Sequence, residues 1–116
     1  MANILAVDDS ASMRQMVTFT LQGAGHKVTL ADDGKQALEI AQRQSFDLVI
    51  TDVNMPVMDG LTLTRELRKL PSFKFAPILV LTTEAGPEKK QEGRAAGATG
   101  WLIKPFNPDQ LLATVK

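Results

Sequence analysis

The side chains that could carry chemistry in this sequence follow short apolar runs. Asp8 and Asp9 follow the first run, and Asp52 follows the third. Thr82 and Lys104 follow the fourth and fifth runs in the same way. Three carboxylates, a hydroxyl and an ammonium, once brought together, suit phosphoryl transfer, because that chemistry depends on positioning and on charge stabilisation.

The adjacent acids Asp8 and Asp9 need a compensating charge. Two like charges about 4 Å apart repel by about 4 kcal/mol near a protein surface. We expect no arginine beside the three carboxylates, so a divalent cation is the remaining source of positive charge. Oxygen ligands in a small site suit Mg²⁺, which commonly partners a phosphate. The sequence therefore predicts a Mg²⁺ site at Asp8, Asp9 and Asp52, with Lys104 on its other side.

Each of these residues also has a purely structural interpretation. Asp9 or Ser10 could cap the first helix, and Asp52 could begin the turn that follows it. Thr82 could be a capping hydroxyl, and Lys104 could be a surface lysine. Four such coincidences at the ends of four apolar runs are less plausible than one shared site.

Five apolar runs alternate with stretches of helical periodicity. The runs are 4–7, 28–31, 48–51, 78–81 and 101–103. Strands that alternate with helices predict an α/β domain with a parallel sheet. Ligands bind such sheets beyond the carboxyl ends of the strands, which is where the polar residues fall. A strand order of 2-1-3-4-5 would bring them to one edge.

The pattern also predicts helix boundaries. The first helix is predicted over 13–24, and Asp33 is predicted to cap the second. The third helix is predicted to contain Leu70 and to end at Pro71. Pro87 and Pro108 suit the first turns of the fourth and fifth helices.

Two elements have unusual patterns. The run 28–31 alternates polar and apolar residues, which predicts a half-exposed edge strand. The fourth helix, within 86–97, offers the core only Ala95 and Ala96, whereas the first offers residues as large as Met16. We therefore expect the fourth helix to be the least stable of the five.

Composition indicates one domain over residues 1–116, with 44% apolar residues and a net charge of zero. That charge balance argues against DNA as the main partner. There is no cysteine, which excludes disulfides and thiolate metal sites. No segment resembles a signal peptide or a membrane span, so we expect a cytoplasmic protein without membrane insertion.

Four motifs closely resemble the receiver domain of two-component response regulators. They are VDDS (7–10), DVNMPVMDG (52–60), LTTE (81–84) and GWLIKPF (100–106). The resemblance covers the whole chain and is closest to single-domain CheY-like chemotaxis regulators. It implies a flavodoxin-like (βα)5 doubly wound parallel sheet of order 2-1-3-4-5. That order is the one known for CheY itself.

The resemblance assigns the phosphorylation site and its metal. Asp52 would be the nucleophile that accepts a phosphoryl group from a phosphohistidine on a sensor kinase. Asp9, Asp52 and the backbone carbonyl of Asn54 would ligate Mg²⁺ directly, and Asp8 would act largely through a water.

The resemblance also implies a switch. Lys104 would pair with one phosphoryl oxygen and the Thr82 hydroxyl with another, which makes room for Trp101 to turn inward. The surface made by the fourth helix, fifth strand and fifth helix would then change. Relatives usually carry Tyr or Phe in place of Trp101. The bond from Lys104 to Pro105 would be cis.

Three residues are implied to tune the lifetime of the phosphorylated form. Relatives that carry Asn and Glu at the positions of Asn54 and Glu84 lose their phosphate quickly, which predicts a short-lived signal. Thr83 is bulkier than the small residue common at its position, so it crowds the same path.

The partners implied are a chemotaxis histidine kinase similar to CheA, a flagellar motor switch protein or other output protein, and a phosphatase. We expect a monomer that is regulatory and not a conventional enzyme. A phosphorelay shuttle is an alternative within the family. An aspartyl-nucleophile phosphohydrolase is a third possibility, but such enzymes carry a second Asp two residues after the nucleophile, where this chain has Asn54.

Overall fold

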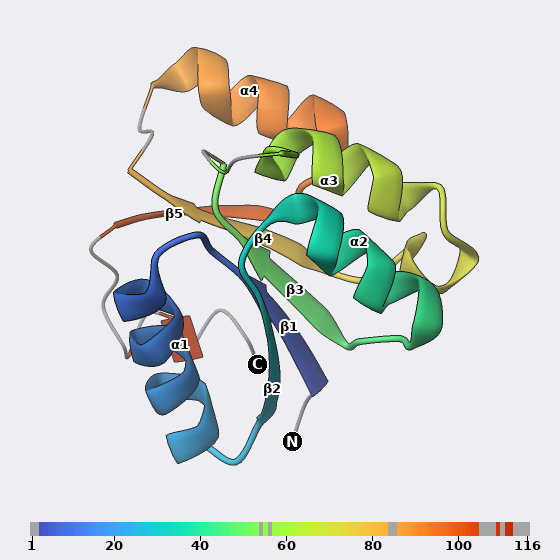
Figure 1. Ribbon diagram of the computed structural model, residues 1–116. Helices are drawn as coiled ribbons and strands as arrows, with labels where there is room; N and C mark the ends of the chain where they lie inside the picture. Colours follow the sequence, from blue (N-terminus) through green and yellow to red (C-terminus); the bar gives the residue numbers. More distant parts are fainter. Residues whose placement is uncertain are drawn as a thin grey trace.

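Five parallel strands form the sheet of this computed structural model, which describes residues 3–53, 55, 57–83, 86–104, 109, 111 and 112. The strands are β1 (Asn3–Val7), β2 (Lys27–Ala31), β3 (Leu48–Thr51), β4 (Ile78–Thr82) and β5 (Gly100–Ile103). Their order is β2-β1-β3-β4-β5, as predicted (Figure 1). The strand with the alternating pattern, β2, lies at one edge, which confirms that prediction.

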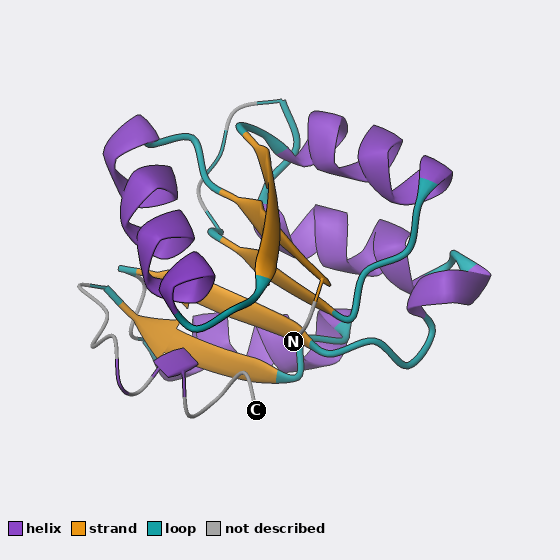
Figure 2. Ribbon diagram, turned by 90° about the horizontal axis from the view of Figure 1, so that it is seen from below, coloured by secondary structure: helices purple, strands orange, loops and turns teal. Residues whose placement is uncertain are grey.

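Helices cover both faces of this sheet. They are α1 (Ala11–Gly23), α2 (Gly34–Arg43), α3 (Gly60–Arg68) and α4 (Pro87–Ala96), with a short 3-10 helix, η1 (Pro71–Phe73). Figure 1 shows α1 on one side and α2, α3 and α4 on the other, and Figure 2 shows the twisted strands between the helices. Residues 109, 111 and 112 have helical backbone, whereas the predicted start of the fifth helix at Pro108 lies outside the described residues.

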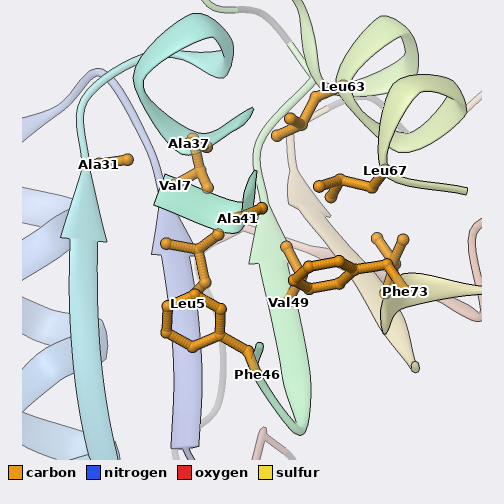
Figure 3. Close-up of a cluster of buried hydrophobic side chains, with 11 residues drawn as sticks. Leu5, Val7, Ala31, Ala37, Ala41, Phe46, Val49, Leu63, Leu67 and Phe73 are labelled. Carbon is orange, nitrogen blue, oxygen red and sulfur yellow. The ribbon is translucent and has the colours of Figure 1, made fainter. Parts of the chain in front are cut away.

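The two faces of the sheet are filled by alternate side chains of the strands. Ile4 and Ala6 of β1 pack with Val17 and Leu21 of α1, whereas Leu5 faces the opposite side. Because both faces are buried, a one-residue slip in register would exchange them, so the register is strongly fixed. Figure 3 shows the cluster on the second face, with Leu5, Val7, Ala31, Ala37, Ala41, Phe46, Val49, Leu63, Leu67 and Phe73.

Side-chain caps start three of the helices close to the strand ends. Ser10, Asp33 and Asp59 each accept a hydrogen bond from the backbone N–H three residues ahead, at the starts of α1, α2 and α3. The predicted cap at Asp33 is confirmed. At α1 the cap is Ser10, so Asp9 is not needed for that role. Pro87 occupies the first turn of α4, as predicted.

Two residues lie outside the places predicted for them. Leu70 follows α3 instead of belonging to it, with φ −85° and ψ 132°. The cause is Pro71, because the residue before a proline is disfavoured in the helical region. Met16 is 49% exposed, because the side of α1 that carries Met16 is turned away from the sheet. Within the described ranges, none of the helices combines the length and apolar character that a membrane span needs.

Helix α4 buries different residues from those predicted. Ala96 is buried as expected, but Ala95 is exposed, and Gly93 is buried in its place. Residues three apart lie on the same face of a helix, so Gly93 and Ala96 together face the sheet. Arg68 of α3 ties the end of α4 to the rest of the molecule, since its guanidinium donates two hydrogen bonds to the carbonyl of Gly97, 3.1 and 2.7 Å long.

We predict that α4 is the least protected of the four described helices in native-state hydrogen exchange. It buries only Gly93 and Ala96, whereas α3 buries Leu61, Leu63 and Leu67 among others. Burial contributes about 25 cal/mol per Å² of apolar surface, so α4 can open locally well below the free energy of global unfolding. Exchange monitored by mass spectrometry measures this, with α1 and α3 as internal references. Equal protection in α4 and α3 would contradict the prediction.

Candidate functional site

The carboxyl ends of β1 and β3 bring three acids together. Carboxylate oxygens of Asp8, Asp9 and Asp52 lie within 4.8 Å of one another. The register explains this, because Val7 pairs with Thr51 and each strand is followed at once by its acid. The backbone N–H of Asp52 donates to the carbonyl of Val7 at 3.0 Å, so the hydrogen bonds between β1 and β3 continue up to the acids.

Lys104 reaches this cluster from beyond the end of β5. Its Nζ lies 2.7 Å from Oδ2 of Asp8 and 3.0 Å from Oδ2 of Asp52. The side chain is only 12% exposed, so Lys104 is not an ordinary surface lysine. The backbone N–H of Lys104 donates to the carbonyl of Thr82 at 2.8 Å, which fixes where the side chain starts.

The pKa values of Asp8 and Lys104 are both raised, but for different reasons. Burial raises the pKa of the Asp8 carboxyl, because loss of hydration outweighs the hydrogen bonds from Lys104 and from the Ser10 N–H. For Lys104, burial acts to lower the pKa, but the hydrogen bonds and charges of Asp8 and Asp52 outweigh it and hold the pKa above its usual value. Lys104 is therefore charged at neutral pH.

The loop after Asp52 folds tightly against that residue. Oδ1 of Asp52 accepts a hydrogen bond from the backbone N–H of Val53 at 2.7 Å. The N–H of Gly60 donates to the carbonyl of Val53 at 2.9 Å. A Cβ at position 60 would overlap the backbone carbonyl of Asp52, so only glycine allows this close approach. The start of α3 thus holds the backbone of Asp52 in place.

Arg14 is a charged residue of the site that the sequence pattern did not reveal. We expected no arginine near the acids, and that expectation was wrong. Arg14 Nη1 donates to the backbone carbonyl of Asp8 at 2.6 Å, and Arg14 lines a small cavity together with Asp8 and Asp52. Helical side chains tilt toward the N-terminus of their helix, so a long side chain in the first turn of α1 reaches back to β1. The position of Arg14 in the first turn of α1 was the sequence feature from which this contact could have been predicted.

The donor set at this edge suits a small divalent cation. Carboxylates are the ligands that Mg²⁺ prefers, and a Mg²⁺ site usually retains several waters. Asp8 and Asp52 are buried, while Asp9 is exposed and makes no hydrogen bond or ion pair with the described residues. Asp9 is therefore available as a ligand on the open side. Asn54, whose carbonyl was predicted to join the metal, lies outside the described residues.

The two predicted switch residues lie on one face of the sheet. Trp101 pairs with Val80 across β4 and β5, and its side chain packs with Val80. Thr82 is two residues beyond Val80 and so lies on the same face. Thr82 is fully buried, and it does not cap α4, whose cap position is Gly86.

The residues predicted to tune the phosphate lifetime are only partly described. Thr83 is exposed next to Thr82. Asn54 and Glu84 lie outside the described residues, as does Pro105 with its predicted cis bond.

Comparison with known proteins identifies what this chain is similar to. The family model of the response regulator receiver domain matches residues 4–116. Chemotaxis protein CheY-3 of Vibrio cholerae is 41% identical over 104 residues, which cover 89% of this chain and 80% of that protein. A gliding motility regulatory protein of Myxococcus xanthus is 39% identical over 101 residues, 87% of this chain but only 13% of that much longer protein.

Solved structures agree with these matches. Chemotaxis protein CheY4 of Vibrio cholerae has a TM-score of 0.95 with 60% identity, over 99% of this chain and 96% of that one. The receiver domain of the sensor histidine kinase PA1611 of Pseudomonas aeruginosa has a TM-score of 0.92 with 33% identity, over 98% and 93%. That structure has a magnesium ion coordinated in its active-site cleft.

We predict that Asp8 lowers the stability of the metal-free protein as pH rises. Its pKa is raised by folding, so its contribution favours the folded state below the unfolded pKa of 3.8 and is lost as pH rises through the folded pKa. Asp8→Asn removes the buried charge and leaves Lys104 its contact with Asp52. The variant is therefore expected to be more stable than the parent at neutral pH in EDTA, and the difference should vanish at strongly acidic pH.

Urea unfolding across this pH range measures the effect. Asp32→Asn is the matched control, since it removes an exposed acid just after β2 and should leave the profile unchanged. If the parent protein instead gains stability relative to Asp8→Asn between acidic and neutral pH, the argument from burial is wrong.

Proposed function

Because the chain belongs to the family of response regulator receiver domains, we propose that it is a CheY-like chemotaxis regulator whose Asp52 accepts a phosphoryl group. Receiver domains are phospho-accepting regulatory proteins and not conventional enzymes, and they interact with histidine kinases and output proteins. The observation that carries the assignment is the position of Asp52, buried at the end of a central strand with Lys104 and two further acids around it.

The proposed reaction at Asp52 is a displacement at phosphorus. A carboxylate oxygen of Asp52 forms a P–O bond while the P–N bond of the phosphohistidine breaks, and the imidazole of the donor leaves and takes up a proton from water. Lys104 already contacts the carboxylate, so its ammonium is placed to stabilise charge on the transferred phosphoryl oxygens. Mg²⁺ held by Asp8, Asp9 and Asp52 supplies further positive charge when bound.

The switch proceeds from Lys104 and Thr82 to Trp101. The hydroxyl of Thr82 bonds a phosphoryl oxygen, and Trp101 changes position on the same face of the sheet. The surface made by α4, β5 and the fifth helix changes with it. Such a change is a shift between two populated states, set by how much better the active state holds the phosphate. Asn54, Glu84 and Thr83 tune how long the phosphate survives.

The chemotaxis assignment rests on the character of the relatives. CheY-3 and CheY4 are chemotaxis proteins, and this chain aligns with most of the length of each. The partners proposed are a histidine kinase similar to CheA, a flagellar motor switch or other output protein, and a phosphatase. A monomer in the cytoplasm stays a prediction.

We predict that Asp52 is the sole phosphorylation site. The protein is treated with acetyl phosphate and Mg²⁺, and the modified residue is mapped by mass spectrometry. Asp52→Asn should abolish labelling, whereas Asp59→Asn, which changes an exposed acid in the same loop, should label normally. Stable labelling of Asp52→Asn at another residue would contradict the assignment of Asp52 as the sole phosphorylation site.

We also predict that Mg²⁺ binding requires Asp9. Asp9→Ala removes an exposed ligand without disturbing the cap at Ser10, so the fold should persist. The affinity for Mg²⁺ should fall more than the roughly 10- to 100-fold that loss of an outer-shell partner costs. Calorimetric titration with Mg²⁺ measures this, and Glu39→Ala on α2 is the control for loss of one exposed acid. Unchanged affinity in Asp9→Ala would remove Asp9 from the metal site.

A further inference from the structure

Gly93 lies in the interior of α4, where the helix meets the only tryptophan of the chain. A Cβ built at this position would overlap Cζ3 of Trp101 and would lie 2.9 Å from its Cε3. The next neighbour, Cδ2 of Leu61, would be 3.6 Å away, which is an ordinary contact. The indole ring of Trp101 therefore rests directly on the backbone of α4, in space that any other residue would fill.

The glycine is unfavourable for the helix itself. Relative to alanine, an interior glycine lowers the folding equilibrium constant about fivefold. Its backbone has ordinary helical geometry, so no turn requires it. By contrast, a Cβ at Gly23 or Gly86 would meet nothing within 4 Å. Gly93 is thus a glycine in the interior of a helix whose missing side chain is replaced by another residue.

The indole connects α4 to the strand end that carries Asp52. Trp101 packs against a buried cluster of Val53, Leu61, Val80 and Ala96. The backbone N–H of Val53 is hydrogen-bonded to Oδ1 of Asp52. On its other side, Trp101 borders an open groove that Lys90 and Arg94 also line.

We propose that Gly93 is a positioning residue of the switch, because it forms the seat that holds the Trp101 indole in the unphosphorylated protein. This inference rests on the proposed function, in which Trp101 changes position when Asp52 is phosphorylated. At this contact the glycine itself offers no side chain that interlocks with the ring. How closely the ring fits against this glycine therefore sets the balance between resting and active states.

The first test displaces the indole without touching it. In Gly93→Ala, the new methyl group occupies the seat, so the emission of Trp101 should shift to the red and its quenching by acrylamide should increase. Gly86→Ala is the matched control, with the same change of composition at the start of the same helix, and should leave both unchanged. Emission and quenching of Gly93→Ala equal to those of the control would overturn the proposal.

The second test uses the sign of a stability change. In a Trp101→Ala background the seat is empty, so Gly93→Ala should raise the folding equilibrium constant about fivefold through helix propensity alone. With Trp101 present, the same substitution should lose that gain. Urea unfolding of the four variants of this cycle measures the coupling. An equal gain in both backgrounds would show that the ring does not need the glycine.

The third test separates this proposal from the function on which it rests. Gly93→Ala weakens the resting state, so at limiting acetyl phosphate its Asp52 should be phosphorylated several-fold faster than in Gly86→Ala. If Asp52 is not phosphorylated in the parent protein, the proposed function fails. If Asp52 is phosphorylated at one rate in parent, Gly93→Ala and Gly86→Ala, the function stands and the seat has no part in the switch.

Discussion

The contact of one ammonium group with two carboxylates is the interaction on which the site depends. Lys104 places Nζ 2.7 Å from Asp8 and 3.0 Å from Asp52, and so allows two buried acids to lie side by side before any metal is bound. Lys104 follows β5, and β4 separates that strand from β3. Only the observed strand order and register let one side chain reach both acids, so the electrostatics of the site and the topology of the sheet are one constraint.

Lys104 also joins the two strands that a switch would have to couple. Its N–H is bonded to the carbonyl of Thr82, and Thr82 shares a face of the sheet with Trp101. In the proposed function, a phosphoryl group on Asp52 would be the stronger partner for the ammonium, and Lys104 would exchange one oxygen for another. The hydrogen bond between the backbones of Lys104 and Thr82 would couple the two residues in that change. The charge that stabilises the resting acids is thus the charge through which phosphorylation would be sensed.

Much of this arrangement could be predicted from the sequence, because short buried strands leave little choice of register. Asp8, Asp52 and Lys104 each follow the last residue of a strand. Because the carboxyl ends of parallel strands lie at one edge of the sheet, the convergence of these three side chains could be predicted from their positions. Arg14 was missed because its role depends on the reach of a long side chain back along α1. The contact at Gly93 was missed for the opposite reason, since a glycine offers no side chain to a periodicity argument.

Two glycines on either side of one cluster show where the molecule is rigid and where it can move. Gly60 lies against the backbone of Asp52, and backbone cannot rotate away, so the start of α3 and the proposed phosphorylation site are fixed to each other. Gly93 lies against the ring of Trp101, a side chain that borders an open groove and that the proposed switch requires to move. Leu61 and Val53 stand between the two in a single packed cluster. In the proposed switch, a change at Asp52 would therefore meet backbone on the α3 side and a side chain on the α4 side, which would direct movement toward the helix with the least buried surface.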